Sequence, residues 1–303
     1  MTSTESSSPP LRPSPDRRSE ALHVTPADVE RRLPEILKEL LTGFGAVVIE
    51  QAVTADDIVD QRERLMRLSS REGEKVTHFQ GANPDKLHLQ RRVWNLLNKG
   101  AVFERMAQIP AVTTVAGAFL GDEFQMGSIA ANRLLPGGPG QEPHLDYPYW
   151  DLYKTSSFPI GINSSFPMNL QATILVHDFT EANGATAFVP YSQGTLHYPD
   201  DRSKFDRDAV RMTGAAGDVV IFNGMCWHCA MPNKSDDDRI GVLLEYLPKF
   251  VRPLEDHSIV SDDVVERATP MLSQLLGIDY PYPQILDEAD ATNAEGRDGT
   301  AWG

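Results

Sequence analysis

Three side chains of this sequence have the types and the spacing that a transition-metal site requires. His144 and Asp146 lie two residues apart, so in a β-strand both would project from one face toward the same point. Far downstream, His228 closes the strand-like run 218–222 and supplies a second imidazole. Two imidazoles and one carboxylate suit Fe(II), because three protein ligands leave the opposite coordination face open for a bidentate co-substrate and O₂.

Arg239 opens a third strand-like run, residues 240–244, shortly after His228. A guanidinium there suits a dicarboxylate co-substrate, because its planar fork can pair bidentately with the carboxylate that is remote from the metal. Each of these residues alone is more often a surface ion pair or a hydrogen-bonded core side chain. Their order and spacing together favour a catalytic metal site with His144, Asp146 and His228 as ligands.

In this order of residues the chain resembles the phytanoyl-CoA dioxygenase family of Fe(II)- and 2-oxoglutarate-dependent oxygenases. The resemblance extends to residues 43–49, which are similar to the first strand of that family, and to residues 178–192, and it covers roughly residues 36 to 250. It implies a mainly β fold with flanking helices around a double-stranded β-helix, the cupin-like jelly roll. It also implies Fe(II) as cofactor, with O₂ and with 2-oxoglutarate held by Arg239.

The resemblance implies a non-haem iron dioxygenase that oxidises, most simply by hydroxylation, an unactivated C–H bond of a small metabolite and releases succinate and CO₂. Asp146 favours hydroxylation over halogenation, because related halogenases replace this carboxylate with Ala or Gly. Desaturation, ring closure, epoxidation and oxidative deamination remain open. Two other classes also remain: a cupin-like metal-dependent isomerase or hydrolase without 2-oxoglutarate, and a non-catalytic jelly roll that binds a small molecule.

The chain departs from the family pattern at three positions. Tyr191 replaces the usual Gly and Gln193 the usual His, and Ala230 stands where many relatives carry a Ser or Thr that hydrogen-bonds the co-substrate. Arg239 must therefore share its task with another donor. Three residues in strand-like segments that flank the ligands are the candidates: Gln125, Asn132 and Thr173.

An aromatic-rich stretch follows the expected iron ligands. It carries Pro, Gly and Ser between its rings, which predicts an active-site lid, and its aromatic side chains would wall a partly apolar or cyclic substrate. Ordinary core packing explains any one of these rings equally well. The residues assigned to the substrate are Tyr147, Tyr149, Trp150 and Phe158.

Composition limits the kind of protein and its partners. With 303 residues and 41% hydrophobic content, the chain can bury one large core. The net charge of −15 repels polyphosphate backbones, so we expect a small-molecule substrate and no nucleic acid. No apolar run is long enough to span a bilayer, and the N-terminus has no apolar signal core, so we expect a cytoplasmic protein without a membrane partner. A homodimer is left open.

The pattern along the chain predicts helices first and strands later. Residues 1–19 and 287–303 lack apolar content and are expected to be disordered tails around a single oxygenase domain, residues 20–286. Thr25 and Pro26 begin a predicted helix that runs to Gly43, a second follows Thr54, and a third covers 101–119 despite Pro110. From residue 124 to about 250, short apolar runs between turn residues predict the jelly-roll core.

Cys226 and Cys229 form a C-x-x-C pair. A redox pair of this kind needs a helix N-terminus to stabilise the thiolate, whereas these residues follow a strand-like run. The chain has no second C-x-x-C to complete a zinc site. Structural packing is therefore the expected role of both thiols.

Overall fold

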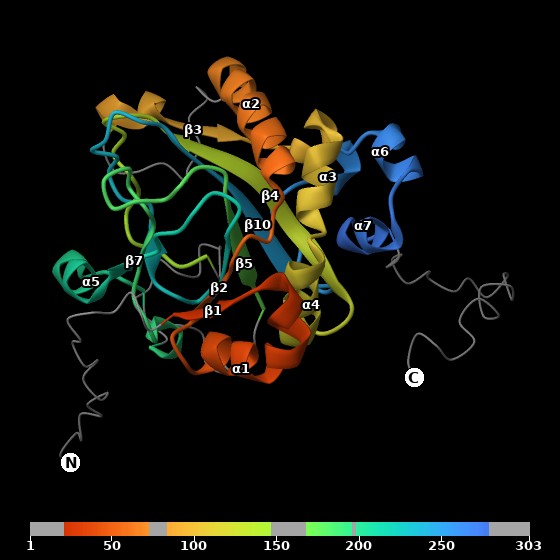
Figure 1. Cartoon of the computed structure of the whole chain (residues 1–303), viewed down its shortest axis with the longest axis horizontal. Helices are drawn as coiled ribbons and strands as arrows, with labels where there is room; N and C mark the ends of the chain where they lie inside the picture. Colours follow the sequence, from red (N-terminus) through yellow and green to blue (C-terminus); the bar gives the residue numbers. More distant parts are fainter. Residues whose placement is uncertain (1–20, 73–83, 147–167, 196–197, 279–303) are drawn as a thin grey trace, which may run out of the picture.

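Two β-sheets and a layer of helices form the protein in this computed structural model, which describes residues 21–72, 84–146, 168–195 and 198–278 (Figure 1). The larger sheet has seven strands in the order β1 (Leu22–Val24), β2 (Ala46–Ile49), β8 (Val219–Asn223), β5 (Leu170–Leu175), β10 (Arg239–Pro248), β4 (Phe124–Leu134) and β3 (Gln90–Val93). The smaller sheet has the order β7 (Val210–Arg211), β6 (Ala187–Phe188) and β9 (His228–Cys229).

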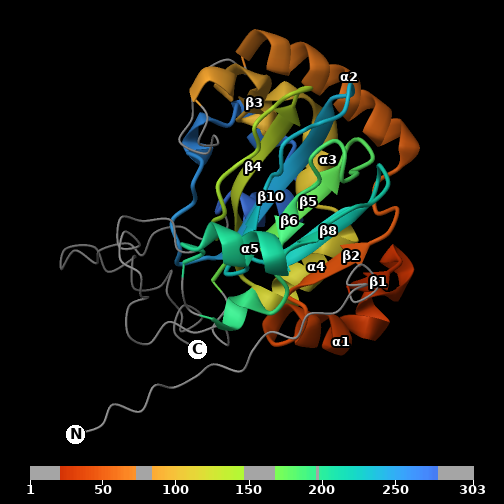
Figure 2. The ribbon, with the colours of Figure 1, turned by 90° about the vertical axis from the view of Figure 1, so that its left-hand side faces the viewer.

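Strand pairing in the larger sheet is antiparallel except between β1 and β2. The longest ladder joins β10 to β4 and contains one irregularity, between Glu245 and Tyr246. The smaller sheet lies over one face of the larger one (Figure 2). Among the described residues the two sheets form an open sandwich and not a closed barrel, which agrees with the predicted mainly β fold with flanking helices.

Helices cover the other face of the larger sheet (Figure 1). The four N-terminal ones are α1 (Val29–Leu41), α2 (Ala55–Glu72), α3 (Ala101–Ala107) and α4 (Pro110–Leu120). The shorter helices are the 3-10 turns η2 (Pro26–Asp28), η3 (Pro84–Leu89), η4 (Leu96–Lys99), η6 (Ser192–Gly194) and η7 (His257–Ile259), with α5 (Arg202–Asp208), α6 (Asp262–Glu266) and α7 (Pro270–Leu275). The first two predicted helices are confirmed, the first as a 3-10 turn followed by α1.

The third predicted helix is wrong as a single element. The chain leaves helical geometry at Ile109, with ψ of 118°, and Pro110 then occupies the first turn of a new helix, α4. Proline is well suited to that position, because its fixed φ matches the helix and its missing N–H would be unsatisfied there in any case. Pro110 therefore starts a helix where the sequence pattern placed it inside one.

Alternation along β8 shows how the strands separate the two layers of the core. Val219 and Ile221 pack into the apolar cluster beneath the helices, whereas Val220 and Phe222 belong to a second cluster between the two sheets. Successive side chains of a strand point to opposite faces, so one short strand serves both clusters. The space between the sheets contains the candidate site.

Two expectations about the ends and division of the chain stay predictions. The predicted tails, residues 1–19 and 287–303, lie outside the described residues, and so the single-domain division is not tested. No helix in the described ranges combines the length and hydropathy that a membrane span requires. Cys226 and Cys229 are both buried free thiols, as their expected packing role requires.

Candidate metal centre

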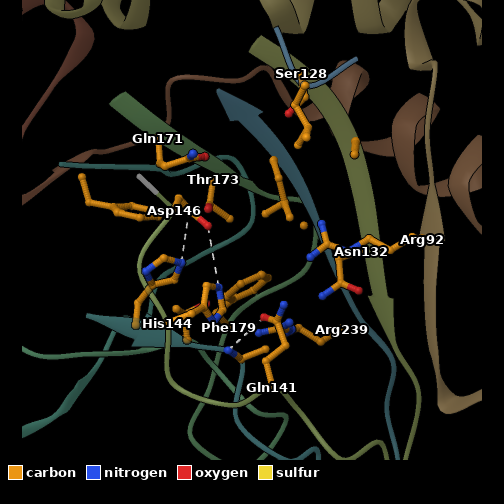
Figure 3. Close-up of a pocket in the computed structure, with 18 of the residues that line it drawn as sticks. Arg92, Ser128, Asn132, Gln141, His144, Asp146, Gln171, Thr173, Phe179 and Arg239 are labelled. Carbon is orange, nitrogen blue, oxygen red and sulfur yellow. Dashed lines mark hydrogen bonds and ion pairs between the residues drawn. The ribbon is translucent and has the colours of Figure 1, made fainter. Parts of the chain in front are cut away.

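The three predicted ligands converge in the described structure (Figure 3). His228 Nε2 lies 3.2 Å from one carboxylate oxygen of Asp146, and His144 Nε2 lies 3.7 Å from the other. One ligand atom from each residue lies within 4.8 Å of those of the other two. Two imidazole nitrogens and a carboxylate oxygen at this spacing can bind one divalent transition-metal ion.

Backbone pairing with the smaller sheet brings the ligands together. His144 and His228 form an antiparallel bridge in which each amide donates to the other residue's carbonyl at 2.9 Å. The amide of Asp146 donates to the carbonyl of Gly224 at 2.9 Å. The bridge fixes the facing pair of imidazoles, whose ring centroids are 4.5 Å apart, and the next backbone bond fixes the carboxylate.

The strand assignment of two ligands needs correction. His228 does not close the strand that begins near Asp218: β8 ends at Asn223, the chain turns, and His228 opens β9 in the other sheet. His144 lies in an isolated bridge instead of a regular strand. The turn depends on Asn223, whose carbonyl and side-chain oxygens accept from the amides of Cys226 and Met225.

Both imidazole rings have a fixed orientation. Nδ1 of His144 lies 2.7 Å from the carbonyl oxygen of Glu142, and Nδ1 of His228 lies 3.0 Å from that of Cys226. A carbonyl can only accept, so each Nδ1 carries the proton and donates it. Each Nε2 is thereby the nitrogen that faces Asp146, which is the arrangement expected of histidines that bind a metal.

Burial and charge set the protonation of the centre. Burial lowers the pKa of His144 to about 4, and the positive charges of His228 and Arg92 act in the same direction. Burial also opposes a proton on His228, but the adjacent charge of Asp146 and its hydrogen bond outweigh burial and raise the pKa of His228. The same pairing overcomes burial at Asp146 and lowers its pKa. In the absence of metal, the proton therefore belongs to His228 rather than to His144.

The metal centre opens into a cavity between the sheets of about 800 Å³, counted out to its open mouth. Strands of the larger sheet form the wall opposite the ligands, and apolar side chains alternate there with polar ones. The polar side chains that line the cavity, besides the three ligands and Arg239, are Arg92, Ser128, Asn132, Gln141, Gln171, Thr173 and Thr186.

Arg239 is the more deeply buried of the two arginines that line this cavity, with 3% of its surface exposed. One terminal nitrogen donates to the carbonyl of Gly184 at 2.6 Å, and the guanidinium carbon lies 4.6 Å from the ring centroid of Phe179. Its Nε has no hydrogen-bond partner, and no carboxylate pairs with it, among the described residues. Burial lowers the pKa of Arg239 to about 9, and the charges of Arg92 and Arg211 add to the effect.

These properties test whether the site fits the iron and the dicarboxylate that the sequence implied. A buried guanidinium without a counter-charge is costly, and an anion that enters the cavity removes that penalty. The donor set of the triad suits Fe(II), and Arg239 lines the same cavity as the triad. The residues present therefore fit both groups.

The three candidate co-substrate donors have different positions. Asn132 and Thr173 line the cavity, and the amide oxygen of Asn132 is buried without a hydrogen-bond partner in the described structure. Gln125 does not line it, so its assignment to the co-substrate is a correction. Its amide nitrogen donates to three carbonyl oxygens at the end of β10 and just beyond, those of Pro248, Lys249 and Val251.

Three further residues line the cavity that no sequence pattern indicated: Arg92, Gln141 and Gln171. Arg92 comes from the edge strand β3 and is only 8% exposed, although the neighbouring Arg91 and Gln90 suggest a surface strand. Gln141 precedes the first ligand closely and accepts from the amide of Ala230 at 3.2 Å, a position that proximity to His144 could have indicated. The aromatic substrate candidates Tyr147, Tyr149, Trp150 and Phe158 lie outside the described residues.

Two departures from the family pattern have a local structural account. Tyr191 has φ of 62°, the left-handed region that favours the usual Gly, and its side chain is 46% exposed. Gln193 is buried, and its amide nitrogen donates to the carbonyl of Gly43 at 3.0 Å. Gln193 thus joins the turn after β6 to the segment before β2.

Fold and site together define a non-haem iron, 2-oxoglutarate-dependent oxygenase. Residues 42–241 match the profile of the family described as phytanoyl-CoA dioxygenase (PhyH). The chain belongs to this family and is a dioxygenase that uses Fe(II), 2-oxoglutarate and O₂.

Individual relatives agree with this class. The "Dioxygenase cdmA" of Talaromyces verruculosus is 28% identical over 257 residues, which are 80% of this chain and 83% of the relative. Among solved structures, the 2-oxoglutarate-dependent carbocyclase SnoK from nogalamycin biosynthesis has a TM-score of 0.57 at 19% identity, covering 80% of this chain and 93% of that one. The epimerase SnoN, in complex with Fe³⁺, 2-oxoglutarate and nogalamycin RO, has a TM-score of 0.56 at 17% identity, covering 78% and 90%. The two structures confirm the jelly-roll fold.

Proposed function

We propose that the protein hydroxylates an unactivated C–H bond of a small, partly apolar or cyclic secondary metabolite. In the overall reaction the substrate, 2-oxoglutarate and O₂ give the alcohol, succinate and CO₂. Bound Fe(II) supplies the redox chemistry that couples loss of CO₂ to oxidation of the C–H bond. The observation that carries the proposal is the buried Arg239, which has no counter-charge among the described residues and lines the same cavity as the His-Asp-His triad.

The proposed metal ligands and the proposed ligand of the distal carboxylate lie on opposite sides of the cavity. His144, Asp146 and His228 would hold the metal on the side of the smaller sheet, and Arg239 would bind the distal carboxylate of 2-oxoglutarate from the larger sheet. Asn132 supports this placement, because it lies on the neighbouring strand and has an unsatisfied buried oxygen.

Arg92 extends the same anion site. It lies opposite Asn132 in the register of β3 and β4, and its charge is close enough to lower the pKa of Arg239. A dianionic co-substrate would be held by charge-assisted hydrogen bonds from two guanidinium groups. We therefore place Arg92 with Arg239, Asn132 and Thr173 in the proposed co-substrate site.

The opposite end of the cavity is the proposed substrate compartment. Ser128 and Gln171 lie there, at the far end from Arg239 and Gln141 in Figure 3. Trp94, Leu243 and Leu254 also line the cavity and are the apolar complement to these two polar groups. Hydrocarbon surface with a few polar anchors suits a metabolite that has an apolar skeleton and one or two oxygen functions.

Anaerobic titration with Fe(II) and 2-oxoglutarate tests the cofactor assignment. We expect a weak visible metal-to-ligand charge-transfer band in the wild-type protein and none in His228→Ala. Arg239→Ala should need at least about 30-fold more 2-oxoglutarate, since breaking a buried charge pair costs 2 kcal/mol or more. Gln125→Ala, whose amide lies outside the cavity, is the matched control and should titrate like the wild type.

Substrate screening under ¹⁸O₂ tests the reaction. Hydroxylation predicts a product that gains one labelled oxygen, with one labelled oxygen in succinate. A product that gains no oxygen would replace hydroxylation by desaturation or ring closure within the same class. Turnover that needs no 2-oxoglutarate and survives Arg239→Ala would instead establish the metal-dependent isomerase or hydrolase.

A further inference from the structure

A second, smaller cavity lies between the two sheets behind the metal centre. Counted out to its open side, it amounts to about 290 Å³ of space free of protein atoms, with room inside for only a small molecule. Its own walls are Leu175, Phe188, Met212 and Val220, all buried side chains. The five side chains that line this inner cavity and also the main cavity are Thr173, Phe179, Thr186, Phe222 and His228.

The lining of the inner cavity is unsuited to water. A buried water needs two to four polar partners, and the lining offers only two threonines and one histidine among aliphatic and aromatic groups. Nδ1 of that histidine, His228, already faces the carbonyl of Cys226, and its Nε2 faces Asp146. Apolar cavities of this kind stay dry and take up small apolar solutes instead.

The inner cavity also approaches the surface at a second place, away from the mouth of the main cavity. Met212 lines both the inner cavity and a shallow surface hollow whose other walls include Ala21, His23 and Val48. A methionine side chain is unbranched and flexible, so it can move aside for a small solute more easily than a branched or aromatic residue. Only this side chain is common to the two spaces.

We propose that the inner cavity is a binding site for O₂, which enters past Met212 and reaches the metal centre from behind Phe222. The inference rests on the proposed function, which requires a small apolar gas at the same centre as an anionic co-substrate. Once 2-oxoglutarate and the metabolite fill the main cavity, its mouth is obstructed. The inner cavity provides a separate apolar path that ends beside His228.

Substitutions at two of its walls would close this path without touching a ligand. Val220→Leu adds a methylene group toward the inner cavity, whereas Val219→Leu makes the same change on the opposite face of β8, beneath the helices. Met212→Trp fills the opening at the other end. If one blocking variant fails to fold, the other still tests the path.

Xenon supplies a readout that does not depend on activity. In crystals of the metal-free protein under xenon pressure, we expect a xenon atom in the inner cavity of the wild type and of Val219→Leu, and lower occupancy in Val220→Leu and Met212→Trp. Absence of xenon from the wild-type cavity would overturn the proposal.

Oxygen kinetics complete the test, with Fe(II), 2-oxoglutarate and a metabolite found by the ¹⁸O₂ screen all present, and succinate as the product measured. The blocking variants should raise the KM for O₂ several-fold and leave the dissociation constant of 2-oxoglutarate unchanged, and Val219→Leu should behave like the wild type. An unchanged KM for O₂ in both blocking variants would reduce the cavity to a packing void. Failure of the proposed function is distinguishable, because the wild type itself would then form no succinate.

Discussion

His144 and His228 present the same nitrogen to the metal but differ in their affinity for a proton. The pKa of His144 is lowered to about 4 by burial, while the charge of Asp146 raises that of His228 above its ordinary value. A proton on Nε2 competes with the metal, so only His228 should compete near neutral pH. As the pH falls through the raised pKa of His228, we expect the affinity for Co(II) to decrease with a slope that approaches one proton. Titration at several pH values measures it, and a slope of two protons would contradict the assignment.

Phe179 positions the guanidinium of Arg239 from the apolar side of the cavity. The cation lies 4.6 Å from the ring centroid and both groups are buried, where such a contact contributes about 2 kcal/mol. Phe179→Leu should therefore weaken 2-oxoglutarate binding by up to about 30-fold, as measured by anaerobic titration. Phe188→Leu changes another buried ring of the same apolar cluster, one that does not line the main cavity with Arg239, and it should leave the affinity unchanged. Equal effects of both variants would point to general loosening of the core.

The sequence predicted the residues whose chemistry requires a fixed order and missed those that only the fold brings near. His144, Asp146, His228 and Arg239 stand in a spacing that few other functions would require, and the structure brings the first three within ligand distance. Arg92 carries no such signal, because a charged residue in an edge strand is ordinarily solvated. Its position becomes meaningful only through its pairing with β4.

At the level of elements, β4 shows why two similar amides have different roles. Asn132 lines the cavity, whereas Gln125, near the other end of the strand, donates to the carbonyls that follow β10. Gln125→Ala should lower the free energy of unfolding by about 1–3 kcal/mol, because buried carbonyls lose their donor. Urea denaturation measures this change. A loss of 2-oxoglutarate affinity without loss of stability would restore Gln125 to the co-substrate site.

Sequence patterns predict best the elements that are long enough to show an apolar periodicity. α1 and α2 are such elements, and the turn residues before each helix also indicate where it begins. The two-residue strand β9 has no periodicity to detect, so its separation from β8 depends on the turn that Asn223 holds. Short strands of this kind are set by tertiary pairing, here the bridge between His144 and His228.

At the scale of the whole molecule, the proposed ligands come from different sheets. The triad is attached to the smaller sheet through β9, and Arg239 belongs to the larger sheet. A metal-bound 2-oxoglutarate would therefore join the two layers and stabilise their packing. At a hundredfold excess over the dissociation constant, binding should add about 2.7 kcal/mol to the free energy of unfolding.

This stabilisation should depend on both ligands together. We expect 2-oxoglutarate to raise the Tm by a few degrees in the presence of Co(II) and far less in its absence, as followed by differential scanning calorimetry. In Asp146→Ala the metal-dependent part of the increase should disappear. An equal shift with and without metal would show that the keto acid binds to one layer only.

The proposed metal ligands and Arg239 belong to opposing layers. The distance between these layers therefore limits the length of a co-substrate that can reach both. Sheets that pack face to face lie about 10 Å apart, and side-chain packing holds that gap nearly constant. If Arg239 binds the distal carboxylate as proposed, a keto acid one carbon shorter than 2-oxoglutarate would not reach both the metal and the guanidinium, and one a carbon longer would have to fold. We therefore expect the spacing of the two β-sheets, more than any single contact, to select among dicarboxylates.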